Sequence, residues 1–194
     1  MRISGGAARG IPLRVPPGDA VRPATDGLRQ AVFSSLGPRV AGALFWDLFA
    51  GSGAYGLEAL SRGAAGGIFV EKNPRTAAHI RANLAAVDKS LGRETADCKI
   101  VPAEALAWIA REDIGSPADL VFVDPPYALI AGVAPALLAN LAARLAAKPE
   151  ALVIFEVPGG LELAPPGWIC VKRLGGRSAR QPGVMIFKKA PASP

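Results

Sequence analysis

The segment Leu120-Val121-Phe122-Val123-Asp124-Pro125-Pro126-Tyr127 decides which fold this chain can adopt. Its first four residues are apolar and rich in β-formers, which predicts a buried parallel strand, and the acid followed by two prolines ends that strand abruptly. In open α/β sheets, ligands bind beyond the carboxyl ends of the strands. We therefore expect a site here, with Asp124 as an acceptor, the carbonyl of Pro125 held rigidly by the two prolines, and Tyr127 as an aromatic face.

A planar amine on a nucleobase suits such a strand end. Asp124 and the carbonyl of Pro125 can draw the two amine hydrogens out of plane and make the nitrogen nucleophilic. Tyr127 can stack on the ring, which contributes about 1–3 kcal/mol per base. The alternative is that these residues end a strand by chance. The pattern Asp124-Pro125-Pro126-Tyr127 is the DPPY signature of methyltransferases that modify exocyclic amines, and the chain resembles that group.

Strand and helix patterns alternate on both sides of this segment, which predicts an α/β fold with a parallel sheet and helices on both faces. After residues 158–160, a hairpin should add antiparallel strands that close the sheet, as in the Rossmann-like Class I methyltransferases. The remaining predicted strands are 44–49, 67–71, 99–101, 152–157, 168–174 and 184–188, and the predicted helices are 27–36, 53–62, 74–87, 103–111 and 133–147.

The N-terminal residues 2–16 predict two short strands around a Gly-rich turn, the second of them an edge strand because it contains Pro12. Its arginines either lie along a phosphate backbone or are simply solvated. A chain of 194 residues suits one hydrophobic core. We predict a single methyltransferase domain over 1–194, with a β-hairpin arm at 1–20 and a catalytic core at 21–194.

The chain carries a net charge of +6 with an isoelectric point near 9.7, which favours a polyanionic partner. Both ends are basic, which suggests a patch made from the two termini. Cys98 and Cys170 have no metal-ligand or redox spacing and are expected to be buried thiols in a reducing compartment. We predict no metal site, a surface position for His79, no membrane-spanning run, and a cytoplasmic location.

A glycine-rich loop, Asp47-Leu48-Phe49-Ala50-Gly51-Ser52-Gly53-Ala54-Tyr55-Gly56, follows a predicted strand and opens a helix. Glu71 ends the next strand 20 residues after Gly51, where an acid can hold ribose hydroxyls. The glycines suit a dinucleotide pyrophosphate or the methionine carboxylate of S-adenosylmethionine, because both bind amides at a helix N-terminus. The D-x-F-x-G-x-G form, the DPPY end and the lack of a histidine suited to hydride transfer favour S-adenosylmethionine.

Fold logic adds further cofactor contacts, and some have alternatives. Glu104 is expected near the adenine amine or is an exposed acid in the first turn of a helix. Asp47 orients the glycine loop, meets the methionine ammonium, or is a buried structural acid; Tyr55 is expected to pack in the core. The predicted cofactor-binding residues in these segments are Asp47, Phe49, Ala50, Gly51, Ser52, Gly53, Glu71, Glu104 and Asp124.

Four motifs in order carry a closer resemblance that covers nearly the whole chain. They are Arg2-Ile3 with Gly5-Gly6 and Arg9-Gly10; Arg22-Pro23-x-Thr25-Asp26-x-x-Arg29 with Phe33; the glycine loop continuing through Ala64; and the DPPY end. The chain is similar to the bacterial 16S ribosomal RNA guanine-N2 methyltransferase family. The resemblance implies methyl transfer from S-adenosylmethionine to the exocyclic amine of a loop guanine, with Arg22 and Thr25 near the methionine end of the cofactor.

The resemblance also implies a partner, 16S rRNA or an assembling small ribosomal subunit, and we expect a monomer. Two alternatives stay open. An adenine-N6 methyltransferase acting on RNA or DNA would use the same four DPPY residues on a different amine. A non-catalytic RNA-binding module on a methyltransferase fold would need a spoiled cofactor loop or a spoiled DPPY end.

Overall fold

A single seven-stranded sheet organises the computed structural model, which describes residues 1–15, 26–92, 97–176, 178 and 181–191. The strands are β1 (Leu44–Leu48), β2 (Gly66–Val70), β3 (Cys98–Val101), β4 (Leu120–Val123), β5 (Leu152–Pro158), β6 (Trp168–Gly175) and β7 (Pro182–Lys189). The helices are α1 (Asp26–Leu36), α2 (Ala54–Ser61), α3 (Pro74–Leu91), α4 (Ala105–Ile109) and α5 (Ile130–Arg144), with the 3-10 turns η1 (Gly37–Val40) and η2 (Tyr127–Leu129).

The strand order is β3-β2-β1-β4-β5-β7-β6. Strands β1 to β5 pair in parallel, and β7 runs antiparallel to both β5 and β6. This arrangement confirms the predicted α/β Class I methyltransferase fold with a closing hairpin. Because β1 and β4 are adjacent and the strand order reverses there, the sheet opens a crevice at their carboxyl ends.

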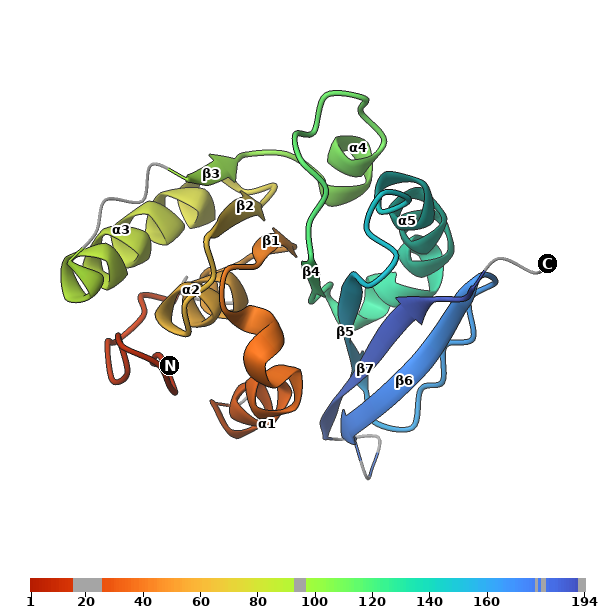
Figure 1. Ribbon diagram of the computed structural model, residues 1–194, viewed down its shortest axis with the longest axis horizontal. Helices are drawn as coiled ribbons and strands as arrows, with labels where there is room; N and C mark the ends of the chain where they lie inside the picture. Colours follow the sequence, from red (N-terminus) through yellow and green to blue (C-terminus); the bar gives the residue numbers. More distant parts are fainter. Residues whose placement is uncertain (16–25, 93–96, 177, 179–180, 192–194) are drawn as a thin grey trace.

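Helices cover both faces of the sheet, with α1, α2 and α3 on one side and α4 and α5 on the other (Figure 1). Alternation along the strands divides the core between these faces. Phe45 packs under α1 to α3 together with Phe122, whereas its neighbour Trp46 packs edge-on against Trp108 of α4. Asp47 lies two residues after Phe45, and so its side chain faces α1 to α3.

Helix α2 approaches β1 and β2 closely, and a glycine allows it. A Cβ atom at Gly56 would lie 2.6 Å from the ring of Phe45 and would also clash with Phe69. The chain enters α2 through Gly53, whose φ of 78° is left-handed and suits glycine. This close packing holds the glycine loop against the end of β1.

The N-terminal arm forms an irregular antiparallel pair in place of the two predicted strands. A bridge joins Arg2 and Pro12, and backbone hydrogen bonds join Ile3 to Ile11 and Leu13 to Met1. The turn of the arm docks on α2, where the amides of Ala7 and Ala8 donate to the carbonyl and hydroxyl of Ser61 at 2.7 and 2.9 Å.

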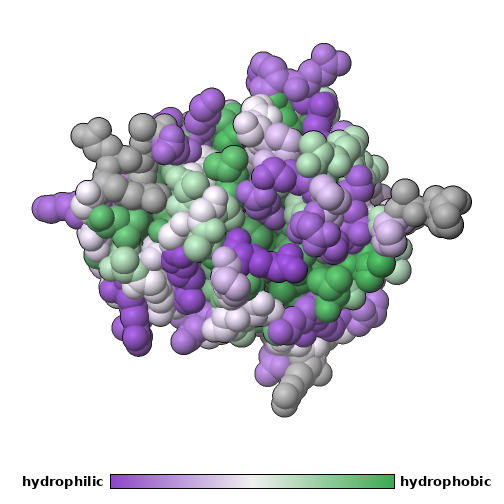
Figure 2. Space-filling view, in the orientation of Figure 1, coloured by the Kyte–Doolittle hydropathy of each residue, from purple (hydrophilic) through white to green (hydrophobic). Residues whose placement is uncertain are grey.

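The described parts of the two basic ends lie on different elements. The N-terminal arm lies against α2, whereas the β6–β7 hairpin is at the opposite side of α1 (Figure 1). Figure 2 shows hydrophilic side chains spread over this face, with hydrophobic ones between them. Arg22, Arg177 and Arg180 lie outside the described residues, so a patch made from the two termini stays a prediction.

Several local predictions are wrong for identifiable reasons. Helix α4 begins at Ala105 and not at residue 103, because Glu104 is its N-cap. Cys170 is exposed because it lies on the edge strand β6, and Cys98 is only partly buried, so neither is the buried thiol that was predicted. His79 is partly buried on α3 rather than fully at the surface.

One segment, Tyr127–Arg144, is long and apolar enough to cross a membrane by length and composition, although the sequence patterns predicted no such run. Its mean hydropathy is 1.4. Ile130, Leu137 and Leu141 on α5 are buried in the core with β4 and β5. Helix α5 therefore packs against the sheet as part of the α/β fold.

Candidate active site

A cavity of about 410 Å³ opens at the carboxyl edge of the parallel strands. That volume lies within the usual range of small-molecule sites. Most of the predicted site residues meet on its wall, although Gly53, Pro125 and Tyr127 do not. The predicted residues on the wall are Asp47, Phe49, Ala50, Gly51, Ser52, Glu71, Glu104, Asp124 and Pro126.

The glycine loop is held by two carboxylates from neighbouring strands. Asp47 is buried and accepts from the amide of Gly56 at 2.9 Å, which ties the end of β1 to the first turn of α2. Burial raises the pKa of Asp47 well above its ordinary value, although the Gly56 amide opposes the shift. Between Asp47 and the glycines, Phe49 has a φ of 61°, a strained conformation for a bulky side chain that is found at functional loops.

Glu71, just after β2, supports the same loop. One of its oxygens accepts from the amide of Gly51 at 2.9 Å, and the other accepts from the amide of Asn73 at 2.9 Å. The amide of Gly53 donates to the carbonyl of Ala50 at 2.7 Å. The glycine amides that were expected to receive a ligand carboxylate therefore already donate within the protein.

Glu104 lies on the cavity wall after β3, and its carboxylate accepts from the amide of Ala107 at 2.8 Å as the N-cap of α4. It is exposed, as the alternative prediction for this acid required. Arg22 and Thr25, predicted near the methionine end of the cofactor, lie outside the described residues.

Two carboxyl groups lie on adjacent strands at the carboxyl edge of the sheet. Val123 pairs with Phe155 in the register of β4 and β5, so Asp124 and Glu156 follow on adjacent strands. Asp124 is partly buried and Glu156 is buried. Two phenols hold Glu156, because Tyr55 donates to one of its oxygens at 3.2 Å and Tyr127 donates to the other at 3.4 Å.

Burial and charge give these two carboxyl groups different pKa values. Burial raises the pKa of Asp124 to about 7. Burial, together with the charge of Asp124, raises the pKa of Glu156 to about 9. Above about pH 7, Asp124 is therefore ionised and can accept hydrogen bonds, while Glu156 retains a proton.

Sequence reasoning missed Glu156, underrated Tyr55 and gave Arg29 no role. Glu156 had a usable signal, because it is an acid near the carboxyl end of the buried strand β5, and parallel strands bring such ends together. Tyr55 packs in the core as predicted, stacked on Phe122 with ring centroids 5.2 Å apart, but it also lines the cavity. Arg29 belongs to the second motif of the resemblance, but its burial could not be predicted, since that burial depends on residues distant in the chain.

Comparisons with known proteins agree with this geometry. A family model described as "Conserved hypothetical protein 95" matches residues 1–177. Ribosomal RNA small subunit methyltransferase D of Escherichia coli is 36% identical over 170 residues, which cover 87% of this chain and 81% of the relative. The protein of the same name from Haemophilus influenzae is 29% identical over 173 residues, with 89% and 86% covered. The solved structure of yhhF from Escherichia coli has a TM-score of 0.80 at 31% identity and covers 98% of this chain and 99% of its own.

Proposed function

Because this chain belongs to the ribosomal RNA small subunit methyltransferase D family, we propose that it methylates the exocyclic N2 amine of a guanine in 16S rRNA. The methyl donor is S-adenosylmethionine. The observation that carries the proposal is the DPPY end of β4 at the wall of the cavity, with Asp124 on that wall and Glu156 on the adjacent strand. A cytoplasmic location, a monomeric state and a single domain over 1–194 stay predictions.

The residues present fit this cofactor. Glu71 has carboxylate oxygens on the cavity wall that can accept from ribose hydroxyls, and Val70, Ala103 and Leu129 offer apolar surface to an adenine ring. Within the described structure, the buried Nη1 atom of Arg29, a residue of the same wall, lacks a hydrogen-bond partner. A charged donor in that position suits a ligand that carries an anionic group.

In the proposed reaction, bound S-adenosylmethionine supplies an electrophilic methyl group on its sulfonium. Asp124 and the carbonyl of Pro125 accept the two hydrogens of the target amine, so that its lone pair is free to attack the methyl carbon in line. A nitrogen–carbon bond forms, the sulfur–carbon bond breaks, and the amine proton leaves to Asp124 or to water. Tyr127 stacks on the flipped base, which a loop nucleotide presents at low cost.

The test is transfer of labelled methyl to unmodified small-subunit particles and to free 16S rRNA, followed by nucleoside chromatography. We expect N2-methylguanosine from the wild type and from Asp113→Ala, a matched control on the exposed surface, and none from Asp124→Ala. Asp124→Ala should still bind S-adenosylhomocysteine. N6-methyladenosine in place of N2-methylguanosine would identify the adenine-N6 alternative, and no transfer to either substrate would contradict the proposed substrate.

A further inference from the structure

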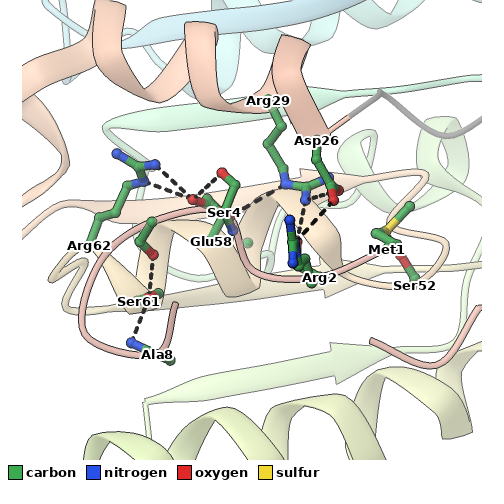
Figure 3. A network of polar contacts seen from close by, with 12 residues as sticks. Met1, Arg2, Ser4, Ala8, Asp26, Arg29, Ser52, Glu58, Ser61 and Arg62 are labelled. Atoms are coloured by element: carbon green, nitrogen blue, oxygen red, sulfur yellow. Dashed lines mark hydrogen bonds and ion pairs between the residues drawn. The ribbon is translucent and has the colours of Figure 1, made fainter. Parts of the chain in front are cut away.

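Arg29 of α1 is fully buried beside the cofactor cavity, although arginine is rarely buried unless it is paired. Figure 3 shows its guanidinium between Asp26 and Glu58, next to the N-terminal arm. Its Nη2 donates to Asp26 at 2.8 Å and to the carbonyl of Arg2, and its Nε donates to Glu58 at 3.4 Å. These contacts fix the plane of the guanidinium but use only two of its three nitrogens.

The third nitrogen, Nη1, is buried and has no hydrogen-bond partner in the described part of the chain. A buried, charged donor without a partner costs more free energy than a typical hydrogen bond contributes. Such an atom next to a ligand cavity is therefore explained when the ligand supplies the acceptor. Arg29 lines this cavity together with Asp47 and Tyr55.

The ion pairs of Arg29 also leave one cation without a matching acid. They join three guanidinium groups with two carboxylates, so positive groups outnumber negative ones by one among Arg2, Arg29, Arg62, Asp26 and Glu58. Both acids are already shared, since Glu58 also pairs with Arg62 at 2.9 Å and Asp26 pairs with Arg2 at 3.9 Å. A ligand carboxylate at Nη1 would neutralise the excess.

Three glycine amides that could donate to such a carboxylate are already used within the protein. The amides of Gly51, Gly53 and Gly56 donate to Glu71, Ala50 and Asp47, respectively. The side chain of Ser52 donates to the sulfur of Met1 at 3.3 Å, as Figure 3 shows. The excess positive charge and the free donor therefore coincide at one residue of the cavity wall, Arg29.

We propose that Nη1 of Arg29 donates to the carboxylate of the methionine moiety of S-adenosylmethionine, an inference that rests on the cofactor named in the proposed function. Arg29 is thereby a cofactor-binding residue, and the docked N-terminal arm is part of the cofactor site because the carbonyl of Arg2 helps to orient it. In this proposal, the arm, α1 and α2 together position the guanidinium of Arg29 at the methionine end of the cofactor.

Two ligands that differ in this carboxylate test the proposal by isothermal titration. S-adenosylhomocysteine carries the amino-acid group, and 5′-methylthioadenosine has the same nucleoside and thioether without it. In Arg29→Met, the affinity for S-adenosylhomocysteine should fall about tenfold to a hundredfold, and the affinity for 5′-methylthioadenosine should stay within about twofold. Arg111→Met is the matched control, because it removes an exposed arginine that belongs neither to this network nor to the cavity wall; it should change neither affinity.

Equal weakening of both ligands in Arg29→Met would show a purely structural role and overturn the proposal, as would no weakening of either. If Arg29→Met does not fold, Arg29→Lys keeps a cation for Asp26 and Glu58 while losing the fork, and the same selective loss is expected. Binding is measured without RNA, so absence of rRNA methylation would contradict the proposed function while leaving this result intact.

Discussion

Methyl transfer should depend on pH through Asp124. Burial raises the pKa of this carboxyl to about 7, and only its ionised form is the strong acceptor that the target amine needs. The ionised fraction then falls from about 90% near pH 8 to about 10% near pH 6. The rate constant of methyl transfer should therefore rise about ninefold between these two pH values and level off above them.

Single-turnover transfer to 16S rRNA at saturating enzyme and cofactor measures this step without product release. Affinity for S-adenosylhomocysteine at both pH values shows whether cofactor binding contributes to the change. Glu156→Gln is the control: it cannot titrate, and since burial rather than Glu156 raises the pKa of Asp124, its rate should rise over the same pH range. A rate that stays constant from about pH 6 to pH 8 with intact cofactor binding would refute the assignment of Asp124.

Two further predictions concern the groups around Asp124. Tyr127→Ala should lower kcat/KM about 5- to 150-fold because it removes the stacking surface, and Tyr127→Phe should lower kcat/KM much less. Because Tyr127 is 40% exposed, neither substitution should change the melting temperature greatly. Equal losses of kcat/KM in the two variants would contradict stacking. Glu156 has a pKa raised from 4.5 to about 9, so the folded state binds more protons than the unfolded state between these values, and stability should fall as pH rises through that window. Thermal unfolding of Glu156→Gln across the window should show a smaller fall than the wild type, most clearly above about pH 7, where Asp124 no longer contributes; parallel curves would be evidence against the raised pKa.

The alternation of strands and helices was predictable because each element carries its own periodicity. Segments such as Leu120–Val123 and Leu152–Pro158 are apolar runs bounded by residues that cannot continue a strand. A predicted helix boundary was wrong where a side chain caps the helix: Glu104 is the N-cap of α4, so the helix begins at Ala105. The docking of the N-terminal arm was not predicted, since its turn donates to Ser61 on α2, a partner more than fifty residues away.

The cofactor loop and the DPPY end were also visible in the sequence, because glycines, prolines and an acid at a strand end act locally on the backbone. What those residues face was decided elsewhere. The amides of Gly51 and Gly53 donate to Glu71 and Ala50 within the protein, which the sequence did not indicate. Only the packed structure shows which hydrogen-bonding groups are used and which remain free.

Sequence patterns alone predicted the fold class, the edge of the sheet at which the cavity opens, and a place for Asp124 at that edge, since all three follow from patterns within a few residues. Only the tertiary structure shows that Glu156 lies beside Asp124 and accepts hydrogen bonds from the phenols of Tyr55 and Tyr127. It also shows that Arg29 is buried and that its Nη1 has no hydrogen-bond partner among the described residues. Strand register and helix packing produce these arrangements by joining residues far apart in the chain. Burial then shifts the pKa values of the carboxyl groups of Asp124 and Glu156, because desolvation and hydrogen-bond geometry arise only in the folded core.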